Sequence, residues 1–399
     1  MTQPLQMFGN IVTAEGTRDA MMCMDIDRPD EAMLHFWGGS TEPAGAALLR
    51  VFKKRVGVVE LEVIAVYRTN EIGGLWMPTL SESEFEYVRG FRALLEEKDG
   101  LLEGEWMHQS GKKGHITLKP LERSDDLVPE KCLSWSDFKS WATRSRDESD
   151  AASFRGHGSN RFPLRTTLHR AGRHRLERYC ADNLLEFRSH AEAVLGIRFN
   201  MQDANDYSML LGLAQHHGLP TPLLDWTSSP YIAAFFAFAY AIESAESRPD
   251  DSHVRIYGLT GAFVRQSSPS TVVLPYVSPY VASLSISPCN NPRLYAQQGQ
   301  FLVTNVGDAE QFLCSMEQKT GTKILLAADV PISSASEALE DLKFMGLTAA
   351  TMFPGLDGVG KMLRHAMLFK HRPLPPAGKP SSGIHEQAKT KGPKTNGQV

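Results

Sequence analysis

Three polar segments of the sequence carry side chains that could bind an anionic ligand. The first places Arg155 between Phe154 and Gly156 and is followed by His157 and Gly158. A guanidinium presents a rigid fork of donors that matches a phosphate, and glycines where a strand becomes a loop would let a ligand approach the backbone. In the alternative interpretation, Arg155 pairs with a carboxylate of the protein and the glycines only form the turn. The spacing favours neither interpretation.

The second segment predicts the start of a buried helix. Ser229 is a good N-cap and Pro230 suits the first helical position, so a helix should begin there. The residues that follow, Tyr231 to Phe238, are apolar on every side of such a helix, which must therefore be buried. A buried helix directs the positive end of its dipole at the residues that precede it.

Asp225, Thr227 and Ser228 stand at that positive end. They either bond to the free amides of the first turn or leave a cavity in which an anion binds. The local sequence favours capping for Thr227 and Ser228. Asp225 lies in an otherwise apolar stretch, so it needs a partner if it is buried, and Arg155 is the candidate.

Two adjacent histidines and two adjacent glutamines complete the polar set. His216 and His217 fall on different faces of a helix, so they are poorly placed to chelate one metal ion, and we expect no metal site. Neutralising a helix C-terminus is the favoured role of each, and a single imidazole contact to a ligand is the alternative. Gln297 and Gln298 lie in the third segment, Arg293 to Phe301, just ahead of a predicted strand. Turn chemistry explains the glycine of that segment but not the paired amides.

The composition excludes several classes of protein. Of the 399 residues, 42% are apolar and 22% are charged, and Lys plus Arg number 42 against 46 Asp plus Glu. The net charge of −4 provides no global positive field for nucleic acid or an acidic membrane. The longest apolar run, Tyr231 to Ile242, is about half of a membrane span, and no leader pattern is visible, so we expect a cytoplasmic protein. Five widely spaced cysteines without a CxxC pair argue against a disulfide framework and a thiolate zinc site.

The elements that must position these segments predict an α+β chain of two domains and a tail. Residues 1–125 are predicted to form a small antiparallel barrel or sandwich, because Val56 to Tyr67 is rich in β-branched residues and Leu102 to Gln109 faces His115 to Leu118 as a hairpin. Within this domain, Glu82 to Glu97 has the apolar spacing of a helix. Its tryptophans are core filler or, alternatively, line a ligand pocket; they are Trp37, Trp76 and Trp106.

Residues 132–366 have mixed α and β character. Arg173 to Leu195 has the spacing of one amphipathic helix, and Ser334 with Glu337 predicts a capping box for a later helix. Residues 371–399 contain few apolar side chains, so this tail should be disordered. The tail is basic, so any nucleic-acid contact is expected through it alone, and no membrane contact is expected.

The polar segments together resemble a known family. In order and spacing, four stretches are similar to the FRG domain, a bacterial and phage family named for its Phe-Arg-Gly motif: Phe154–Gly156, Gln215–Ala237, Gln297–Phe301 and Met352–Gly358. The similarity covers roughly residues 132–364. FRG domains occur as additions to varied proteins, so the resemblance by itself implies little about activity.

A more distant similarity is to mono-ADP-ribosyltransferases, which use NAD. By this resemblance Arg155 would contact the NAD phosphates, and Thr227 and Ser228 would match the hydroxyl segment. Gln298 or Gln297 stands where those enzymes have a catalytic Glu. An amide can hydrogen-bond to a ribose hydroxyl, but unlike a carboxylate it cannot offset the positive charge of an oxocarbenium-like transition state.

Two hypotheses of different classes follow. The first is an ADP-ribosyltransferase-like enzyme that binds NAD or a related nucleotide in a cleft, with a protein or nucleic-acid target in conflict with phages. The second is a non-catalytic nucleotide-sensing or interaction module, while a hydrolase built on Asp225 and His216 is weakest because no nucleophile elbow accompanies them. All need one concave site, and a carboxylate entering it, such as Glu186 or Glu192, would favour the transferase. The candidate catalytic residues are Arg155, Thr227 and Gln298, and the candidate ligand contacts are Arg155, His157, His216, His217, Asp225, Thr227, Ser228, Gln297 and Gln298.

Overall fold

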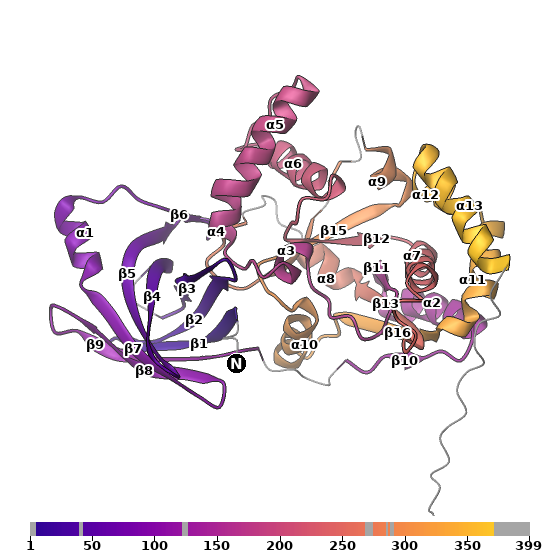
Figure 1. The fold of residues 1–399 in the computed structure, drawn as a ribbon. Coiled ribbons are helices and arrows are strands. Elements are labelled where there is room, and N and C mark those ends of the chain that lie inside the picture. The colour runs from indigo at the N-terminus through magenta and orange to yellow at the C-terminus, as the bar shows by residue number, and fades with distance from the viewer. Residues whose placement is uncertain are drawn as a thin grey trace, which may run out of the picture.

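The computed structural model describes residues 5–39, 43–121, 127–267, 274–284, 286–287 and 291–370. The predicted tail 371–399 and Cys289 lie outside these ranges. The described chain has the α+β architecture that the sequence predicts: a barrel is followed by a domain of mixed helices and strands (Figure 1). None of the described helices combines the length and the apolar character that crossing a bilayer requires.

The N-terminal domain is a closed antiparallel barrel of eight strands. The strands run around it in the order β4-β3-β2-β1-β9-β8-β7-β5, and pairing of β4 with β5 closes the ring. Their bounds are β1 (Gln6–Thr13), β2 (Gly16–Asp25), β3 (Arg28–Trp37), β4 (Gly45–Arg55), β5 (Val58–Thr69), β7 (Phe91–Lys98), β8 (Leu101–His108) and β9 (Lys113–Lys119). The short β6 (Leu75–Trp76) pairs with the end of β5. The hairpin predicted from the sequence is β8 and β9, in which Leu102 lies opposite Leu118.

Apolar side chains fill the interior of the barrel. Each strand contributes to one buried cluster that includes Met22, Leu61, Leu95 and Leu118. The space left among these side chains measures about 10 Å³, which is room for about one water molecule. The described barrel residues therefore form a packed core, and none of the three tryptophans lines this small space.

The helix predicted over Glu82–Glu97 is wrong in its second half. Helix α1 spans Glu82–Arg89 and ends at Gly90, after which the chain enters strand β7. A side chain at position 90 would meet the His108 ring, because a Cβ there would lie 2.6 Å from Nε2. From Phe91 on the period is two residues: Ala93 and Leu95 are buried in the barrel, whereas Leu94 is exposed.

The second domain is built on a seven-stranded sheet with the order β10-β16-β13-β11-β12-β15-β14. All neighbours are antiparallel except β10 and β16, which are parallel. The bounds are β10 (Glu130–Lys131), β11 (Ala151–His157), β12 (Leu223–Thr227), β13 (His253–Thr260), β14 (Val281–Leu284), β15 (Gly299–Thr304) and β16 (Leu325–Pro331). The Phe-Arg-Gly segment thus lies on the central strand of the sheet.

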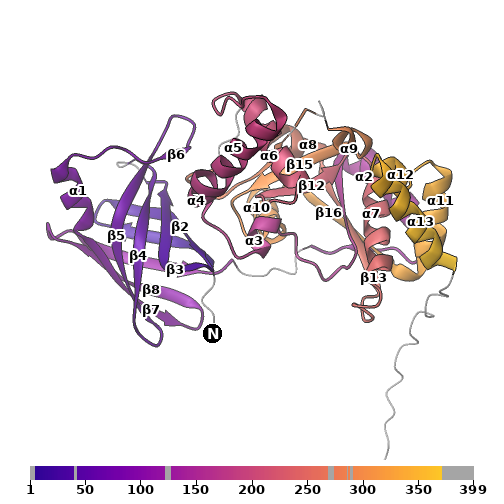
Figure 2. The same cartoon turned by 45° about the horizontal axis from the view of Figure 1, so that its top comes forward.

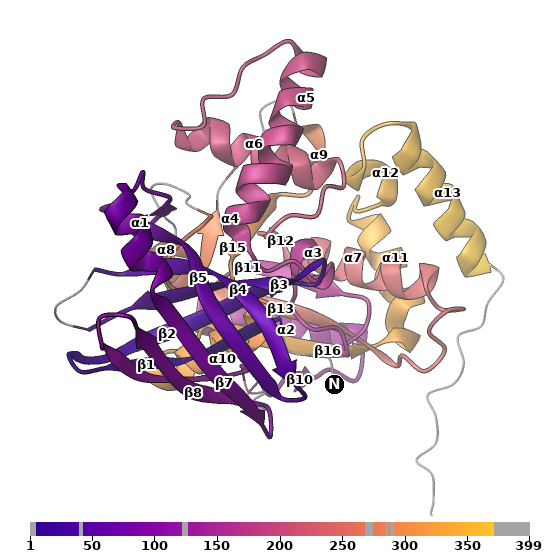
Figure 3. The same ribbon diagram turned by 60° about the vertical axis from the view of Figure 1, so that its left-hand side comes forward.

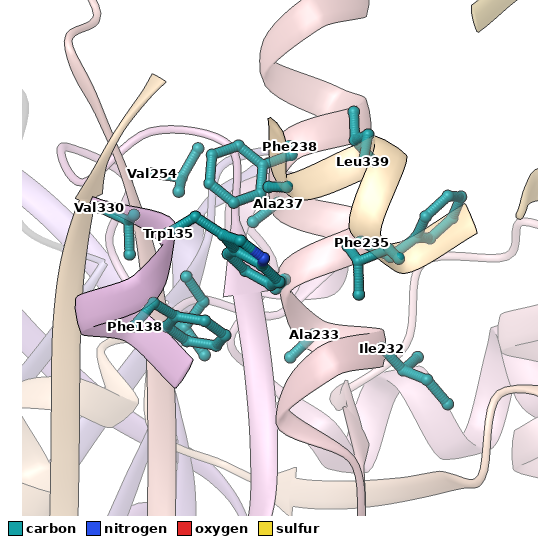
Figure 4. Packing of buried hydrophobic residues seen from close by; sticks show 14 of the residues in the cluster. Trp135, Phe138, Ile232, Ala233, Phe235, Ala237, Phe238, Val254, Val330 and Leu339 are labelled. Atoms are coloured by element: carbon teal, nitrogen blue, oxygen red, sulfur yellow. The ribbon is translucent and has the colours of Figure 1, made fainter. Parts of the chain in front are cut away.

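Helices cover both faces of this sheet (Figure 2). Helices α2 (Trp135–Ser149), α7 (Pro230–Glu243) and α11 (Ala335–Phe344) pack on one face. Figure 4 shows their shared core, in which Trp135 and Phe138 of α2 lie close to Phe238 of α7 and to Val330 of β16. Helices α8 (Gly261–Gln266) and α10 (Ala309–Thr320) pack on the other face against Tyr257 and its neighbours.

A third group of helices projects beside the sheet (Figure 3). It contains α3 (Thr167–Arg170), α4 (Leu176–Arg178), a π-helical stretch (Tyr179–Leu184), α5 (Leu185–Leu195) and α6 (Ala204–His216). The single helix predicted over Arg173–Leu195 begins only at Leu176, because the preceding residues reach toward the barrel. Its predicted core residue Val194 is 84% exposed.

The remaining short helices are α9 (Pro292–Ala296) and α12 (Ala349–Met352), and the described chain ends with α13 (Leu356–Lys370). The capping box predicted at Ser334 is wrong. A 3-10 turn over Ile332–Ser334 leads directly into α11, so Ser334 is itself helical, with φ −79° and ψ −3°, and its side chain makes no capping bond.

A buried carboxylate of the barrel joins the two domains. Asp25, at the end of β2, accepts hydrogen bonds from the backbone N–H groups of His174 and Arg175 at 2.7 and 3.0 Å. It also accepts from Arg173 Nε at 3.2 Å and from Arg178 Nη1 at 2.9 Å. The Asp25 side chain is only 1% exposed, so these bonds replace all of its contact with water.

Two buried histidines near this boundary predict a loss of stability on acidification. Burial lowers the pKa of both His35 and His174 to about 4. The folded chain keeps them neutral while the unfolded chain protonates them near pH 6.5, so stability is full above that pH and falls as the pH drops toward 4. Between pH 7 and 5.5 we expect the free energy of unfolding, measured in urea, to fall by about 1 kcal/mol per histidine. His35→Gln should reduce this difference, and an unchanged difference would contradict the prediction.

Candidate functional site

A cavity of about 740 Å³ opens where strands β11 and β12 diverge. In the described sheet these two strands are paired at one position, Phe154 opposite Thr227, and beyond it β11 pairs with β13 alone. Residues of α3, α6, α7, α9, α12 and α13, or of the loops beside them, complete the walls. The volume lies within the range of small-molecule binding sites.

The cavity brings together most of the candidate residues from the sequence. Its lining includes Arg155, His157, His216, Asp225, Thr227 and Gln297. His217, Ser228 and Gln298 are described residues that lie outside the lining.

Arg155 bridges the gap between the diverging strands. Its Nε donates to His157 Nε2 at 3.1 Å, and its Nη1 donates to the backbone carbonyl of Asp225. The predicted ion pair with the Asp225 carboxylate is present but long, with Oδ2 3.9 Å from Nη1, and the backbone carbonyl of the same residue makes the hydrogen bond. Burial lowers the pKa of Arg155, Asp225 partly offsets this and nearby Arg170 lowers it further, but a guanidinium stays charged. Its Nη2 has no hydrogen-bond partner among the described residues.

His157 fixes the orientation of this guanidinium. Because its Nε2 accepts from Arg155, its proton is on Nδ1, which faces the Phe162 carbonyl at 3.3 Å. Burial and then the charge of Arg155 lower the pKa of His157 well below its usual value. His157 is therefore neutral at physiological pH and acts as a positioning group.

Asp225 is held by an amide that sequence reasoning missed. Gln215 Nε2, on α6, donates to both carboxylate oxygens of Asp225 at 3.2 and 3.0 Å. Thr221 Oγ1 in turn donates to Gln215 Oε1. The Asp225 side chain is 60% exposed, so it reaches the cavity mouth without the partner that full burial would require.

The hydroxyl of Thr227 serves the backbone at the start of α7. Thr227 Oγ1 donates to the Gln297 carbonyl at 2.8 Å and accepts from the Ser229 N–H at 3.2 Å. Ser229 Oγ accepts from the Ile232 N–H, so the predicted N-cap and the proline at N1 both occur. The capping predicted for Thr227 and Ser228 is therefore wrong, because Ser229 caps the first turn of α7. Thr227 bonds instead to the N–H of the cap residue, and Ser228 Oγ donates to Gln298.

The paired glutamines are also engaged within the protein. Gln298 has φ +46°, and its Oε1 accepts from Ser228 Oγ at 2.9 Å. Gln297 Nε2 donates to the Met352 carbonyl at 3.0 Å, which ties the start of β15 to α12. Both amides that the sequence singles out therefore already have partners within the protein.

A carboxylate does enter the cavity, from a residue of the predicted buried helix that sequence reasoning did not consider. Glu243, at the end of α7, lines the cavity, and its Oε1 lies 2.7 Å from His365 Nε2 on α13. Glu186 and Glu192 are not in the lining, and Glu192 instead accepts from Arg198 and the Phe199 N–H. A signal existed in the sequence, because Phe236, Tyr240 and Glu243 follow helical spacing and so share one face of α7.

Cations outnumber carboxylates in the lining. The cations are Arg155, Arg170, Arg248, Arg293 and Lys361, and the carboxylates are Asp225 and Glu243. Arg248 lies over the Phe162 ring at 4.5 Å, while Arg293 and Lys361 lie over the Phe353 ring at 5.4 and 4.1 Å. The site is therefore electropositive and suited to an anion. Arg170, Arg248 and Lys361 carried no local signal, because isolated basic residues are common on protein surfaces.

The glycines of the first segment allow α7 to pack closely on β11. A Cβ at Gly156 would lie 1.9 Å from the Ala233 carbonyl oxygen, and a Cβ at Gly158 would lie 2.2 Å from the Tyr240 ring. Both glycines border the cavity, but the group that lies against each of them belongs to α7 and not to a ligand. The glycines thus have a packing reason that the sequence interpretation did not include.

Replacing Gly156 by Ala should destabilise the fold by about 1–3 kcal/mol, because the new methyl group must displace the Ala233 backbone. Chemical denaturation followed by tryptophan fluorescence measures this change. Gly360→Ala is the matched control: no neighbouring element lies within 4 Å of the place that a Cβ would take there on α13, so Ala should be neutral or slightly stabilising. Equal stability of the two variants would contradict the packing role of Gly156.

Metal and thiol chemistry have little basis in the described residues. They contain no group of three or more His, Cys, Asp or Glu side chains placed to hold a metal ion. Cys23, Cys132 and Cys180 form no disulfide with another described cysteine. Burial raises the pKa of Cys23 to about 12 and that of Cys132 to about 11, so both thiols stay protonated and unreactive.

Comparison with known families identifies the domain that carries this cavity. Residues 150–246 match the family model of the FRG domain. The chain therefore contains an FRG domain, which runs from β11 through α7 and includes Arg155, Asp225, Thr227 and Glu243. No curated protein matches the chain.

Proposed function

We propose that the FRG domain binds NAD or a related nucleotide in this cavity, with Arg155 as the phosphate contact. The observation that carries the proposal is the state of the Arg155 side chain. It is 17% exposed and held on two sides by His157 and the Asp225 carbonyl, and its Nη2 is unpartnered among the described residues. A preorganised guanidinium of this kind loses little entropy when it binds a phosphate.

Aromatic side chains offer surfaces for a base. Phe236 and Phe353 meet edge to face with their centroids 5.8 Å apart, and both line the cavity. His216, on α6, lines the same cavity, and burial followed by the charge of Arg293 lowers its pKa. An imidazole and two phenyl rings in one cavity lining favour a planar heterocycle as the uncharged part of the ligand.

Binding without turnover is the function that we favour, because Gln297 and Gln298 have partners within the protein and cannot replace a carboxylate. Glu243 supports a second candidate, the transfer or hydrolysis of the nucleotide's glycosidic bond. Its carboxylate reaches the cavity and lies close to His365, so it could stabilise a cationic transition state.

One experiment distinguishes the two functions. The full chain is incubated with labelled NAD, with and without a cell extract, and bound NAD, released nicotinamide and transferred label are measured. Binding alone, unaffected by Glu243→Gln, supports a sensor. Turnover supports the enzyme if Glu243→Gln abolishes it. Glu340→Gln, which changes an exposed residue of α11, is the control and should leave turnover unchanged. Absence of binding refutes the proposal.

A further inference from the structure

Four of the five cations of the cavity form two groups on different walls, and the fifth, Arg248, lies over the Phe162 ring. The first group is Arg155 on β11 and Arg170 on α3, and the charge of Arg170 acts on the pKa of Arg155. The second group is Arg293 on α9 and Lys361 on α13, which share the Phe353 ring. Each group thus has its own local structure.

Helix α7 lies between these walls. Figures 1, 2 and 3 all place α7 between α3 on one side and α12 with α13 on the other. Along α7 the cavity is lined by residues three or four positions apart, from Ala233 to Glu243. At 1.5 Å per residue this face extends over about 15 Å, much longer than a single phosphate.

Each group contains one cation that has no carboxylate partner among the described residues. Arg170 donates to the Arg165 carbonyl at 2.6 Å, and neither Arg170 nor Lys361 forms an ion pair with a carboxylate among the described residues. The carboxylates near the other two cations are loosely placed: Asp225 and Asp357 each lie 3.9 Å from their guanidinium. Each wall therefore keeps positive charge for a ligand to match.

We infer that the ligand carries two separate phosphate groups, one held by Arg155 and Arg170 and the other by Arg293 and Lys361. This inference rests on the proposed function and narrows it to a class. The ligand is a nucleotide that carries, besides its first phosphate or diphosphate, a phosphate monoester at a separate position. The planar part of the ligand lies between the two walls, beside Phe353 and Phe236.

Two matched pairs of nucleotides test the inference by titration calorimetry on the full chain. ADP and adenosine 3′,5′-bisphosphate contain the same atoms but have adjacent or separated phosphates, and NADP differs from NAD by one separate phosphate. We expect the bisphosphate to bind at least about tenfold more tightly than ADP, and NADP at least about tenfold more tightly than NAD. One additional charge-assisted contact provides a difference of this size. Lys361→Gln should remove this preference without weakening ADP or NAD, whereas Arg170→Gln should weaken all four. Lys343→Gln, on α11 and outside the cavity, should change nothing.

The outcomes separate this inference from the proposed function. Equal affinity for the two isomers, or a preference that Lys361→Gln leaves intact, overturns the two-phosphate ligand. If Arg155→Gln still abolishes binding in that case, the proposed nucleotide site stands. Failure of all four nucleotides to bind refutes the nucleotide site, and the inference with it.

Discussion

Arg155→Gln should weaken nucleotide binding about a hundredfold, which corresponds to about 3 kcal/mol. The glutamine removes the positive charge and the free Nη2 donor from the cavity wall, while the sheet keeps its pairing with β13. Titration calorimetry with NAD and NADP measures the loss. Arg155→Lys should cost less, about tenfold, because it keeps the charge but loses the planar fork.

Two controls make this result specific to the cavity. Arg161→Gln removes a guanidinium from the loop after β11 that does not line the cavity, so affinity should stay unchanged. Circular dichroism must show that Arg155→Gln is folded, since Arg155 also connects two strands. A folded Arg155→Gln variant with the affinity of the original chain would rule out Arg155 as the phosphate contact.

Asp25→Ala should lower the free energy of unfolding by about 3–5 kcal/mol, the range for breaking a buried ion pair from one side. The substitution leaves two arginines and two backbone N–H groups without their shared acceptor. Urea denaturation measures the loss, and limited proteolysis of the segment between α3 and α4 reports whether the boundary between the domains opens first.

Asp27→Ala is the matched control, two residues away on the same turn. Asp27 also pairs with Arg178, at 2.8 and 2.9 Å, but its side chain is 43% exposed, so we expect a loss below about 1 kcal/mol. If Asp25→Ala and Asp27→Ala are equally stable, burial of the Asp25 carboxylate does not add to the free energy of unfolding.

The barrel could be predicted from the sequence because alternation and turn residues are local signals. The error over Glu82–Glu97 arose at one residue. Up to Gly90 the apolar spacing is that of a helix, and after it the same residue types alternate into the barrel, which only the neighbouring strands β5 and β8 reveal. Likewise, Arg173 and Arg175 leave the predicted helix because Asp25, far away in sequence, binds them.

The site was predictable where one helix terminus organises it. The Ser229 cap and the Pro230 start predict that Thr227 and Asp225 lie beside the N-terminus of α7, and in the structure both line the same cavity as Arg155. The opposite wall could be predicted only in part: Arg293 lies in the third polar segment, whereas Lys361 reaches the cavity only through the packing of α13. The hydrogen bond from Arg155 to the Asp225 carbonyl was missed for a similar reason: a backbone carbonyl exposed by two diverging strands leaves no mark in the sequence.

The segment held by Asp25 begins three residues after Arg170. Between them, the Gly172 carbonyl accepts from the Ile26 N–H at 2.9 Å, so a hydrogen bond connects the barrel turn to the residues that directly follow α3. Any partner that displaces this turn must therefore pull on one wall of the cavity. Thermodynamic coupling is reciprocal. If displacement of the turn weakens binding at Arg170, a molecule bound at Arg170 opposes the displacement by an equal free energy.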